Sequence, residues 1–377
     1  MKIPIIKPYL GEKEERAVIE VLRSGWLVQG RKVQEFETLF AQLQGAKYAF
    51  AVNSATSGLH LALIAVGIKE GDEVIVPAFS FPATANVVLM VKAKPVFVDI
   101  DLSTYNIDVN RIEPVINSNT RAIIPVHLFG LPADMDPIME LAHKYGLKVI
   151  EDAACAHMSE YKGYKVGTVG DVGVFSFHPR KPITTGEGGI VTTNDPKIAE
   201  DIKIRRNHGE TISDIEREYR PLLYPDFDRL GFNYRMTDIQ AAIGVEQLKK
   251  LPWIVNKRRE LANRYTERLM EHPFLVPPVE PPNYFHNYQS YVVLIKPDSP
   301  YSQDEVTLKL QERGIMVRKG TYSLPHVKLY RSLYGFTEKD FPNSFYAEHH
   351  TLTLPLYPTM TTEEQEYVID TLYELFK

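Results

Sequence analysis

The sequence predicts an α/β fold in which a mostly parallel central sheet is flanked by helices and followed by a smaller C-terminal α+β domain. Short apolar strands alternate with helical patterns between residues 48 and 193, which is typical of a parallel sheet with helices on both faces. A long helical stretch follows at 237–270 and should bridge to the second domain. We therefore expect two domains, 1–250 and 251–377, each large enough to bury its own core.

An N-terminal arm and two helical patterns, near 13–23 and 32–44, come before the first strand. Short apolar segments of the length expected for buried strands then recur along the chain. They cover 48–52, 73–77, 95–98, 121–126, 147–151, 172–177 and 189–193. Helical patterns lie between them, for example at 135–144. The last of these strands is expected to complete the sheet.

The C-terminal part is separated from the long helical stretch by a proline-rich segment, 273–282. It contains a predicted strand at 291–295, a helix at 303–313 and a terminal helix from Thr361. This combination predicts the smaller α+β domain.

Composition narrows the functional classes. Apolar residues make up 44% of the chain and charged residues 24%, as in ordinary globular proteins. A net charge of −5 without a basic run argues against nucleic acid and anionic membranes as partners. No apolar run approaches the roughly 20 residues that span a bilayer, and the single cysteine excludes an internal disulfide or a thiolate-held iron–sulfur cluster. The histidines show no metal-binding spacing. We expect a cytoplasmic enzyme without a metal.

A lysine in a loop rich in small residues is the most informative feature. Lys181 lies in F-S-F-H-P-R-K-P-I-T-T-G-E-G-G, residues 175–189, where small and hydroxylated neighbours allow the backbone to approach a ligand closely. A partly desolvated lysine loses its proton more easily and can then form a Schiff base with a carbonyl. The aldehyde of pyridoxal phosphate (PLP) is the obvious carbonyl. A structural or phosphate-binding lysine is the alternative.

Two adjacent carboxylates end a buried strand upstream of this loop, at Glu151 and Asp152. PLP acts as an electron sink only while its pyridine nitrogen stays protonated, and a carboxylate held against that nitrogen achieves this. Asp152 is the candidate, at the carboxyl end of a strand, where open α/β sheets bind ligands. Glu151 alternates to the other face and is expected to be structural. A helix cap is the alternative for Asp152.

A phosphate anchor is predicted where the strand at 49–52 leads into a helix from Leu59. The intervening polar turn, 53–58, contains Ala55, Thr56 and Ser57. This arrangement directs backbone N–H groups and the positive end of the helix dipole at an anion. An ordinary N-cap by Ser54 or Thr56 is compatible with it. Ser176 and the region of Asn233 are further candidate contacts.

Nearly the whole chain carries motifs of one family. They are S-G-W-L-V-Q-G at 24–30, N-S-A-T-S-G-L-H-L-A-L at 53–63, P-A-F-S-F-P-A-T-A-N at 77–86, P-V-H-L-F-G at 125–130, E-D-A-A at 151–154, the Lys181 motif, G-F-N-Y-R-M-T-D-I-Q-A-A-I-G at 231–244 and L-T-L-P-L-Y-P at 352–358. In these motifs the chain resembles the DegT/DnrJ/StrS family of PLP-dependent nucleotide-sugar aminotransferases, which has the aspartate-aminotransferase fold (fold type I). The Lys181 and Asn233 motifs are specific, and the others are individually weak.

The resemblance implies a role for individual residues. Lys181 matches the Schiff-base lysine, and Asp152 the partner of the pyridine nitrogen. The other implied cofactor contacts are a ring-stacking aromatic (Phe81), phosphate binders (Thr56, Ser57 and Ser176) and an asparagine reaching the phosphate from the neighbouring subunit (Asn233). The segment 207–236 then lines an active site shared across a homodimer, with a solvated surface loop as the alternative.

One position departs from the family. Many members have Gln, His or Glu where Cys155 stands, and that side chain bonds near the ring hydroxyl of the cofactor. Cysteine is a weak donor and acceptor, so this contact is in question, although His157 lies close by in sequence. For the sugar substrate, the candidate contacts are Trp26, His178 and His326.

The resemblance also implies the reaction. An amino acid, taken to be L-glutamate, would give its nitrogen to a nucleotide-linked keto-deoxysugar, with a 4-keto-6-deoxyhexose favoured over a 3-keto sugar, in amino-sugar or surface-polysaccharide synthesis. A PLP-dependent nucleotide-sugar dehydratase is one alternative. Relatives that dehydrate sugars have histidine in place of the lysine, so Lys181 favours transamination. A non-enzymatic regulatory protein on the same fold is the other alternative.

Overall fold

The computed structural model describes residues 1–212, 222 and 224–377. Its largest sheet has seven strands in the order β1 (Tyr48–Val52), β10 (Gly189–Thr193), β9 (Val172–Ser176), β6 (Lys148–Asp152), β5 (Thr120–Ile123), β2 (Glu73–Pro77) and β4 (Lys94–Val98). The strands from β9 to β4 pair in parallel. β10 lies inside the sheet and runs antiparallel to both β1 and β9. The predicted mostly parallel sheet is confirmed.

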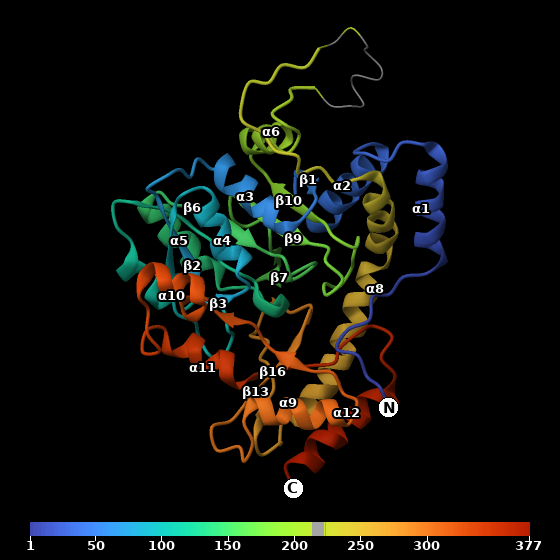
Figure 1. Cartoon of the computed structure of the whole chain (residues 1–377), viewed down its shortest axis with the longest axis vertical. Coiled ribbons are helices and arrows are strands. Elements are labelled where there is room, and N and C mark those ends of the chain that lie inside the picture. Colours follow the sequence, from blue (N-terminus) through green and yellow to red (C-terminus); the bar gives the residue numbers. More distant parts are fainter. Residues whose placement is uncertain (213–221, 223) are drawn as a thin grey trace.

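Helices cover both faces of this sheet (Figure 1). One face packs on α2 (Arg31–Gln44), α5 (Met135–Tyr145) and α8 (Asp238–Leu269), and the other on α3 (Ala55–Ala65), α4 (Ala83–Met90) and α6 (Pro196–Arg205). Successive residues of a strand enter opposite cores, as Val149 and Ile150 of β6 do, because side chains alternate along a strand. Burial on both faces explains why these strands are continuously apolar.

The smaller sheet is antiparallel. Its order is β11 (Leu275–Val276), β13 (Tyr291–Ile295), β16 (Thr351–Leu354) and β14 (Arg318–Lys319). The helices α9 (Gln303–Glu312) and α12 (Thr362–Leu375) pack with it around a separate core. The 32-residue helix α8 contributes to both cores and runs from one sheet toward the other in Figure 1. The proposed domain boundary at residues 250 and 251 falls inside α8.

The other elements are short, and some of them link the two halves of the chain. They are β3 (Phe79–Ser80), β7 (Glu160–Tyr161), β8 (Tyr164–Lys165), β12 (Tyr284–Phe285), β15 (Tyr322–Ser323), α10 (Lys328–Tyr334), α11 (Pro342–His350) and the 3₁₀ turns η1 (Val109–Arg111), η2 (Glu113–Val115), η3 (Leu128–Gly130) and η4 (Leu324–His326). β15 pairs with β3, and Tyr330 of α10 is buried in the core of the larger sheet. Conversely, Ile3 of the N-terminal arm bridges to Ile315 and is buried in the core of the smaller sheet.

Two expected boundaries are wrong. The turn expected at 53–58 is already helical from Ala55, because Ser54 caps the helix by accepting the Ser57 N–H at 3.1 Å. The strand expected at 121–126 ends at Ile123, shortly before Pro125, which has no N–H to give to a strand ladder.

No helix in the described part of the chain is long and apolar enough to cross a membrane. Among the same residues, no group of three or more His, Cys, Asp or Glu side chains is placed to hold a metal ion.

A buried ion pair fastens α1 (Glu12–Ser24) to α8. The Glu14 carboxylate accepts hydrogen bonds from Gln247 Nε2 at 2.8 Å and Lys250 Nζ at 2.7 Å. It also accepts the Gly11 N–H at 2.9 Å and so closes the start of α1. Burial alone would raise the pKa of Glu14, but the bonds from Lys250 and Gln247 outweigh it and lower the pKa below its ordinary value.

We expect Glu14→Gln to reduce the apparent free energy of unfolding at pH 7 by about 1–3 kcal/mol, because Lys250 is left without its anion. The lowered folded-state pKa means that this stabilisation is present above the ordinary value of 4.5 and is lost as the pH falls. Urea unfolding followed by circular dichroism at pH 7 and near pH 4 measures the effect. The exposed neighbour Glu15, changed to Gln, is the control. A variant effect that does not shrink at low pH contradicts the electrostatic explanation.

Candidate active site

Lys181, Cys155 and Asp152 come together at the carboxyl ends of β6 and β9. Lys181 lies in the loop between β9 and β10, where its N–H donates to His178 O at 2.8 Å. Its Nζ donates to Cys155 Sγ at 3.0 Å, and its charge acts on Asp152. Cys155 follows directly after β6. The parallel pairing of β6 with β9 therefore brings together an amine, a thiol and a carboxylate from two segments of the chain.

The Asp152 carboxylate is buried, with 5% of the residue exposed. Its Oδ2 accepts the Thr84 hydroxyl at 2.8 Å, and its Oδ1 accepts the Ala154 N–H at 3.2 Å. Burial raises the pKa of Asp152, and these bonds together with the charge of Lys181 offset only part of the rise. A cationic group placed against Asp152 would hold it ionised. The site therefore suits the protonated ring nitrogen of a cofactor.

The contact from Thr84 was missed by the sequence analysis. Its only signal was a hydroxylated residue within the P-A-F-S-F-P-A-T-A-N motif. Thr84 Oγ1 also lies 3.0 Å from Ser80 Oγ, which links Asp152 to the turn that carries Phe81. Phe81 is 63% exposed, and its ring centroid lies 6.4 Å from that of Tyr322. An exposed ring in this turn is free to contact a planar ligand, and its stacking on the cofactor stays a prediction.

The start of α3 lies close to the end of β9 and the start of β10, and the three together form a cradle. Ser176 of β9 pairs with Gly189 of β10, and a Cβ on Gly189 would lie 2.6 Å from Ala55 N. Only glycine allows this approach. The N–H groups of Ala55 and Thr56 open the helix and have no acceptor within it. The cradle therefore fits an anion such as a phosphate.

One of the predicted phosphate contacts, Ser57, is already engaged within the chain. The Ser57 N–H donates to Ser54, and its hydroxyl donates to Asn53 Oδ1 at 2.6 Å. Asn233 lies nearby, since its backbone oxygen accepts from Asn53 Nδ2 at 3.4 Å. Its side chain is exposed. Its predicted reach into a neighbouring subunit stays a prediction.

His157 does not replace the missing polar side chain at Cys155. It is fully buried, and its ring packs against those of Phe40, Phe175 and Phe177. Burial and the nearby charge of Lys181 lower the pKa of His157 to about 3. His157 is therefore a neutral core residue, and Cys155 remains the side chain that faces Lys181.

The three predicted substrate contacts lie in different places. His178 is beside Lys181, and its Nδ1 accepts the Arg180 N–H at 3.1 Å. Burial lowers its pKa. Trp26 lies between α1 and α2, where its Nε1 donates to Gln29 O at 3.3 Å. His326 bonds through both ring nitrogens, to Ser323 Oγ at 2.7 Å and Thr337 O at 2.9 Å. The geometry supports His178 most and His326 least.

The segment 207–236, predicted to be functional, lies partly outside the described residues. At its base, isolated bridges join Asn207 to Asn233 and Glu210 to Phe227. Leu222 and Tyr224 are exposed.

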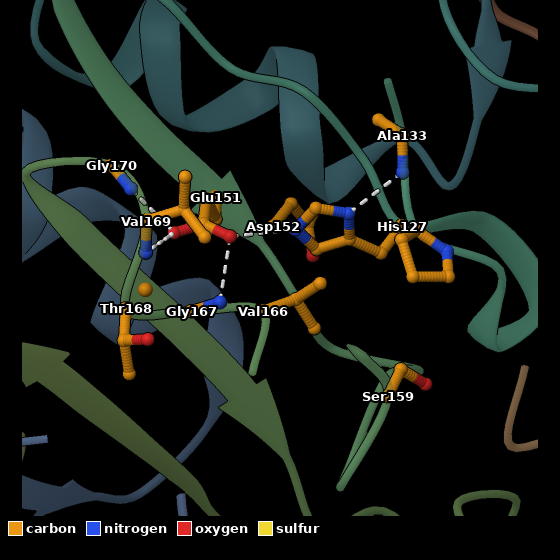
Figure 2. Close-up of polar contacts among 12 residues, drawn as sticks. His127, Ala133, Glu151, Asp152, Ser159, Val166, Gly167, Thr168, Val169 and Gly170 are labelled. Carbon is orange, nitrogen blue, oxygen red and sulfur yellow. Dashed lines mark hydrogen bonds and ion pairs between the residues drawn. The ribbon is translucent and has the colours of Figure 1, made fainter. Parts of the chain in front are cut away.

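Glu151, expected to be structural, is fully buried on the other face of β6. Its carboxylate bonds to His127 and to three backbone N–H groups of the turn before β9 (Figure 2). Together with Asp152, it shows the alternation that the sequence predicted for the end of this strand.

Comparisons with known proteins agree with the resemblance. Spore coat polysaccharide biosynthesis protein SpsC of Bacillus subtilis is 38% identical over 378 residues, covering 100% of this chain and 97% of the relative. PseC of Helicobacter pylori, an aminotransferase of pseudoaminic acid biosynthesis, superposes with a TM-score of 0.92 at 30% identity and covers 100% of this chain and 99% of PseC.

Spr1654 of Streptococcus pneumoniae has been solved in a PLP form and a PMP form. The PMP form has a TM-score of 0.93 at 28% identity and covers 99% of each chain. The family that these relatives indicate consists of PLP-dependent enzymes. Its profile, that of the DegT/DnrJ/EryC1/StrS aminotransferases, matches residues 8–373 of this chain. The chain therefore belongs to the DegT/DnrJ/EryC1/StrS aminotransferase family and is an aminotransferase.

Proposed function

We propose that this aminotransferase uses PLP to move nitrogen from L-glutamate to the ketone of a nucleotide-linked 4-keto-6-deoxyhexose. The observation that carries the proposal is the convergence of Lys181 and buried Asp152 at one edge of the sheet. The anion cradle at the start of α3 meets the same edge through Gly189.

PLP, when bound, supplies an electron sink that stabilises the negative charge left on a carbon after its proton departs. Asp152 would hold the proton on the ring nitrogen. Lys181 would bind the aldehyde carbon and, once displaced by the donor, carry the proton between substrate and cofactor as a general base and acid. The phosphate would lie on the N–H groups of Ala55 and Thr56, beside Ser176.

The donor is proposed to be a dicarboxylate because two cations lie beside Lys181. Arg180 and Arg318 line one pocket, and Arg318 is close enough to Cys155 for their charges to interact. Burial lowers the pKa of Arg318, and the charge of Arg180 lowers it further. Arg318 has no ion-pair partner among the residues that the structure describes. A carboxylate between the two arginines would remove this repulsion.

The acceptor is proposed from two kinds of support. The names of SpsC and PseC place those relatives in the biosynthesis of spore coat polysaccharide and of pseudoaminic acid, and Lys181 favours amination over dehydration. A base that can also rebind the cofactor completes a transamination cycle, whereas histidine cannot do so. His178, next to the site, is the nearest of the proposed sugar contacts.

The working unit is proposed to be a homodimer with shared sites. The exposed side chain of Asn233 lies at the base of the segment 207–236, next to the cradle of its own chain. In a dimer it would contact the phosphate held by the other subunit.

We predict that borohydride reduction of the PLP-loaded protein fixes a pyridoxyl group on Lys181, because this amine faces the cofactor site. Peptide mapping by mass spectrometry locates the label. Lys181→Ala should stay folded, bind PLP noncovalently and lose the label, whereas Lys165→Ala, a change in β8, should keep it. A label on Lys162 or Lys165 instead would overturn the assignment.

With glutamate and a nucleotide-linked 4-keto-6-deoxyhexose, we predict an amino sugar formed one-for-one with 2-oxoglutarate. Mass spectrometry of the product and a dehydrogenase-coupled assay for 2-oxoglutarate measure both sides. Alanine, which lacks the second carboxylate, should support at most a tenth of the rate, since an unpaired buried cation costs roughly 1–3 kcal/mol. A product that has lost a hydroxyl and gained no nitrogen identifies a dehydratase.

Mixing Lys181→Ala and Asn233→Ala chains should recover part of the activity that each variant lacks alone. Subunit exchange would produce mixed dimers in which one site contains both native residues, so up to about a quarter of the wild-type rate is expected for random pairing. Activity is measured after exchange has been demonstrated with differently tagged chains. No recovery under those conditions places Asn233 in its own chain's site or outside any site.

A further inference from the structure

The Glu151 carboxylate, next to Asp152 on the strand, lies in a network of hydrogen bonds (Figure 2). Glu151 and its partner His127 are both fully buried. Glu151 Oε1 accepts the N–H groups of Val169 at 2.8 Å and Gly170 at 2.7 Å. Its Oε2 accepts the Gly167 N–H at 2.6 Å and is 2.9 Å from His127 Nε2. Four donors therefore surround one carboxylate.

The tautomer of His127 follows from its other ring nitrogen. Nδ1 lies 3.0 Å from the Ala133 nitrogen and accepts its N–H, so Nδ1 carries no proton. Nε2 then carries the ring proton and donates it to Glu151. Every partner of Glu151 is a donor, and only an ionised carboxylate, which solely accepts, satisfies all four.

His127 also holds the backbone of Asp152. The His127 N–H donates to Asp152 O at 3.0 Å, and the Asp152 N–H donates to Pro125 O at 2.9 Å. These bonds extend the parallel alignment past the end of β5, where Val126 bridges to Asp152. His127 therefore fixes Asp152 through its backbone and Glu151 through its ring.

The other side of the network fixes the turn before β9. Gly167 packs directly on that strand, since a Cβ on Gly173 would lie 2.3 Å from Gly167 Cα. Gly167 O accepts the Thr192 hydroxyl of β10 at 2.6 Å. The turn therefore links β6 to the two strands that flank the Lys181 loop.

We propose that Glu151 and His127 are positioning residues for the reaction: their hydrogen bonds hold the end of β6 so that the Asp152 carboxylate faces the ring nitrogen of the cofactor. The proposal rests on the proposed function. Glu151, a buried carboxylate that does not line the anion cradle, would in this way help to keep the ring nitrogen of the cofactor protonated. Because Glu151 and Asp152 are adjacent on one strand, a shift of one moves the other.

The test compares Glu151→Gln with Asp152→Asn in the PLP-loaded protein. Glutamine has the same shape as glutamate, but its side-chain NH₂ group is a donor. In either orientation of the amide, this group faces N–H donors whose hydrogen bonds it cannot accept. We expect the visible spectrum of bound PLP to change in the direction seen for Asp152→Asn. We also expect about a tenfold loss of kcat, because a small displacement of a group that must be aligned for reaction lowers the rate by one to two orders of magnitude, with the KM for glutamate within twofold of wild type.

Asp171→Asn is the matched control. Asp171 joins the same two strands at the far end of β6, where its carboxylate accepts the Val149 N–H at 2.9 Å and Lys148 Nζ at 2.7 Å. This variant should melt at a lower temperature and keep the wild-type spectrum and kcat. If Asp171→Asn alters the spectrum as much as Glu151→Gln does at a similar loss of melting temperature, the role of Glu151 is only structural.

A second pair of variants keeps the proposal testable if Glu151→Gln does not fold. His127→Gln retains an N–H that can reach Glu151, whereas His127→Leu removes it. We expect the glutamine variant to keep a larger share of kcat and a spectrum closer to wild type. Equal spectra and rates for the two variants would overturn the proposal.

These outcomes are separate from failure of the proposed function. A wild-type protein that forms no visible band with PLP contradicts the cofactor assignment before any variant is compared. A wild-type protein that binds PLP and aminates the sugar, alongside a Glu151→Gln protein with the same spectrum and kcat, contradicts only the positioning role.

Discussion

The site depends on the parallel pairing of β6 with β9. This pairing places Asp152 opposite Val174 and Glu151 opposite Gly173. The register decides the face on which each carboxylate lies, because a slip of one residue would exchange them. It also decides how far the loop after β9 extends from Asp152. The glycine opposite Glu151 leaves room for the turn that Glu151 binds. A single strand pair therefore brings the segments that carry Lys181 and Asp152 to the same edge of the sheet.

Local patterns in the sequence were enough to predict most of the larger sheet and the central chemical residues. The alternation of Glu151 and Asp152 was predictable because a strand has a period of two, and Lys181 stood out by the composition of its loop. The start of α3 was not predicted correctly. Small polar residues such as Ser54 and Thr56 suit both turns and helix N-termini, and only the bond from the Ser57 N–H to Ser54 shows where the helix begins.

Features that depend on distant segments could not be predicted. Thr84 bonds to Asp152 across 68 residues, and nothing near either residue encodes that pairing. The same holds for the bridge between Ile3 and Ile315 and for the pairing of β15 with β3. The environment of His157 was also hidden, since its burial among phenylalanine rings follows from the packing of α2 on β9. These contacts come from the tertiary structure and not from local propensity.

The proline within α8 has a mechanical consequence. Pro252 lies within the part of α8 that packs on the larger sheet, since Leu251, Ile254 and Val255 all belong to that core. The turns that pack on the smaller sheet come later, at Ala262, Tyr265 and Leu269. Pro252 has no N–H, so the carbonyl of Leu248 lacks its helical partner and the rod is weakest in bending at that turn. A rigid helix anchored in two cores transmits a rotation of one directly to the other. Core contacts of Leu251, Ile254 and Val255, together with the bond from Lys250 to Glu14 of α1, hold both sides of the weak turn in place and so compensate for the missing hydrogen bond.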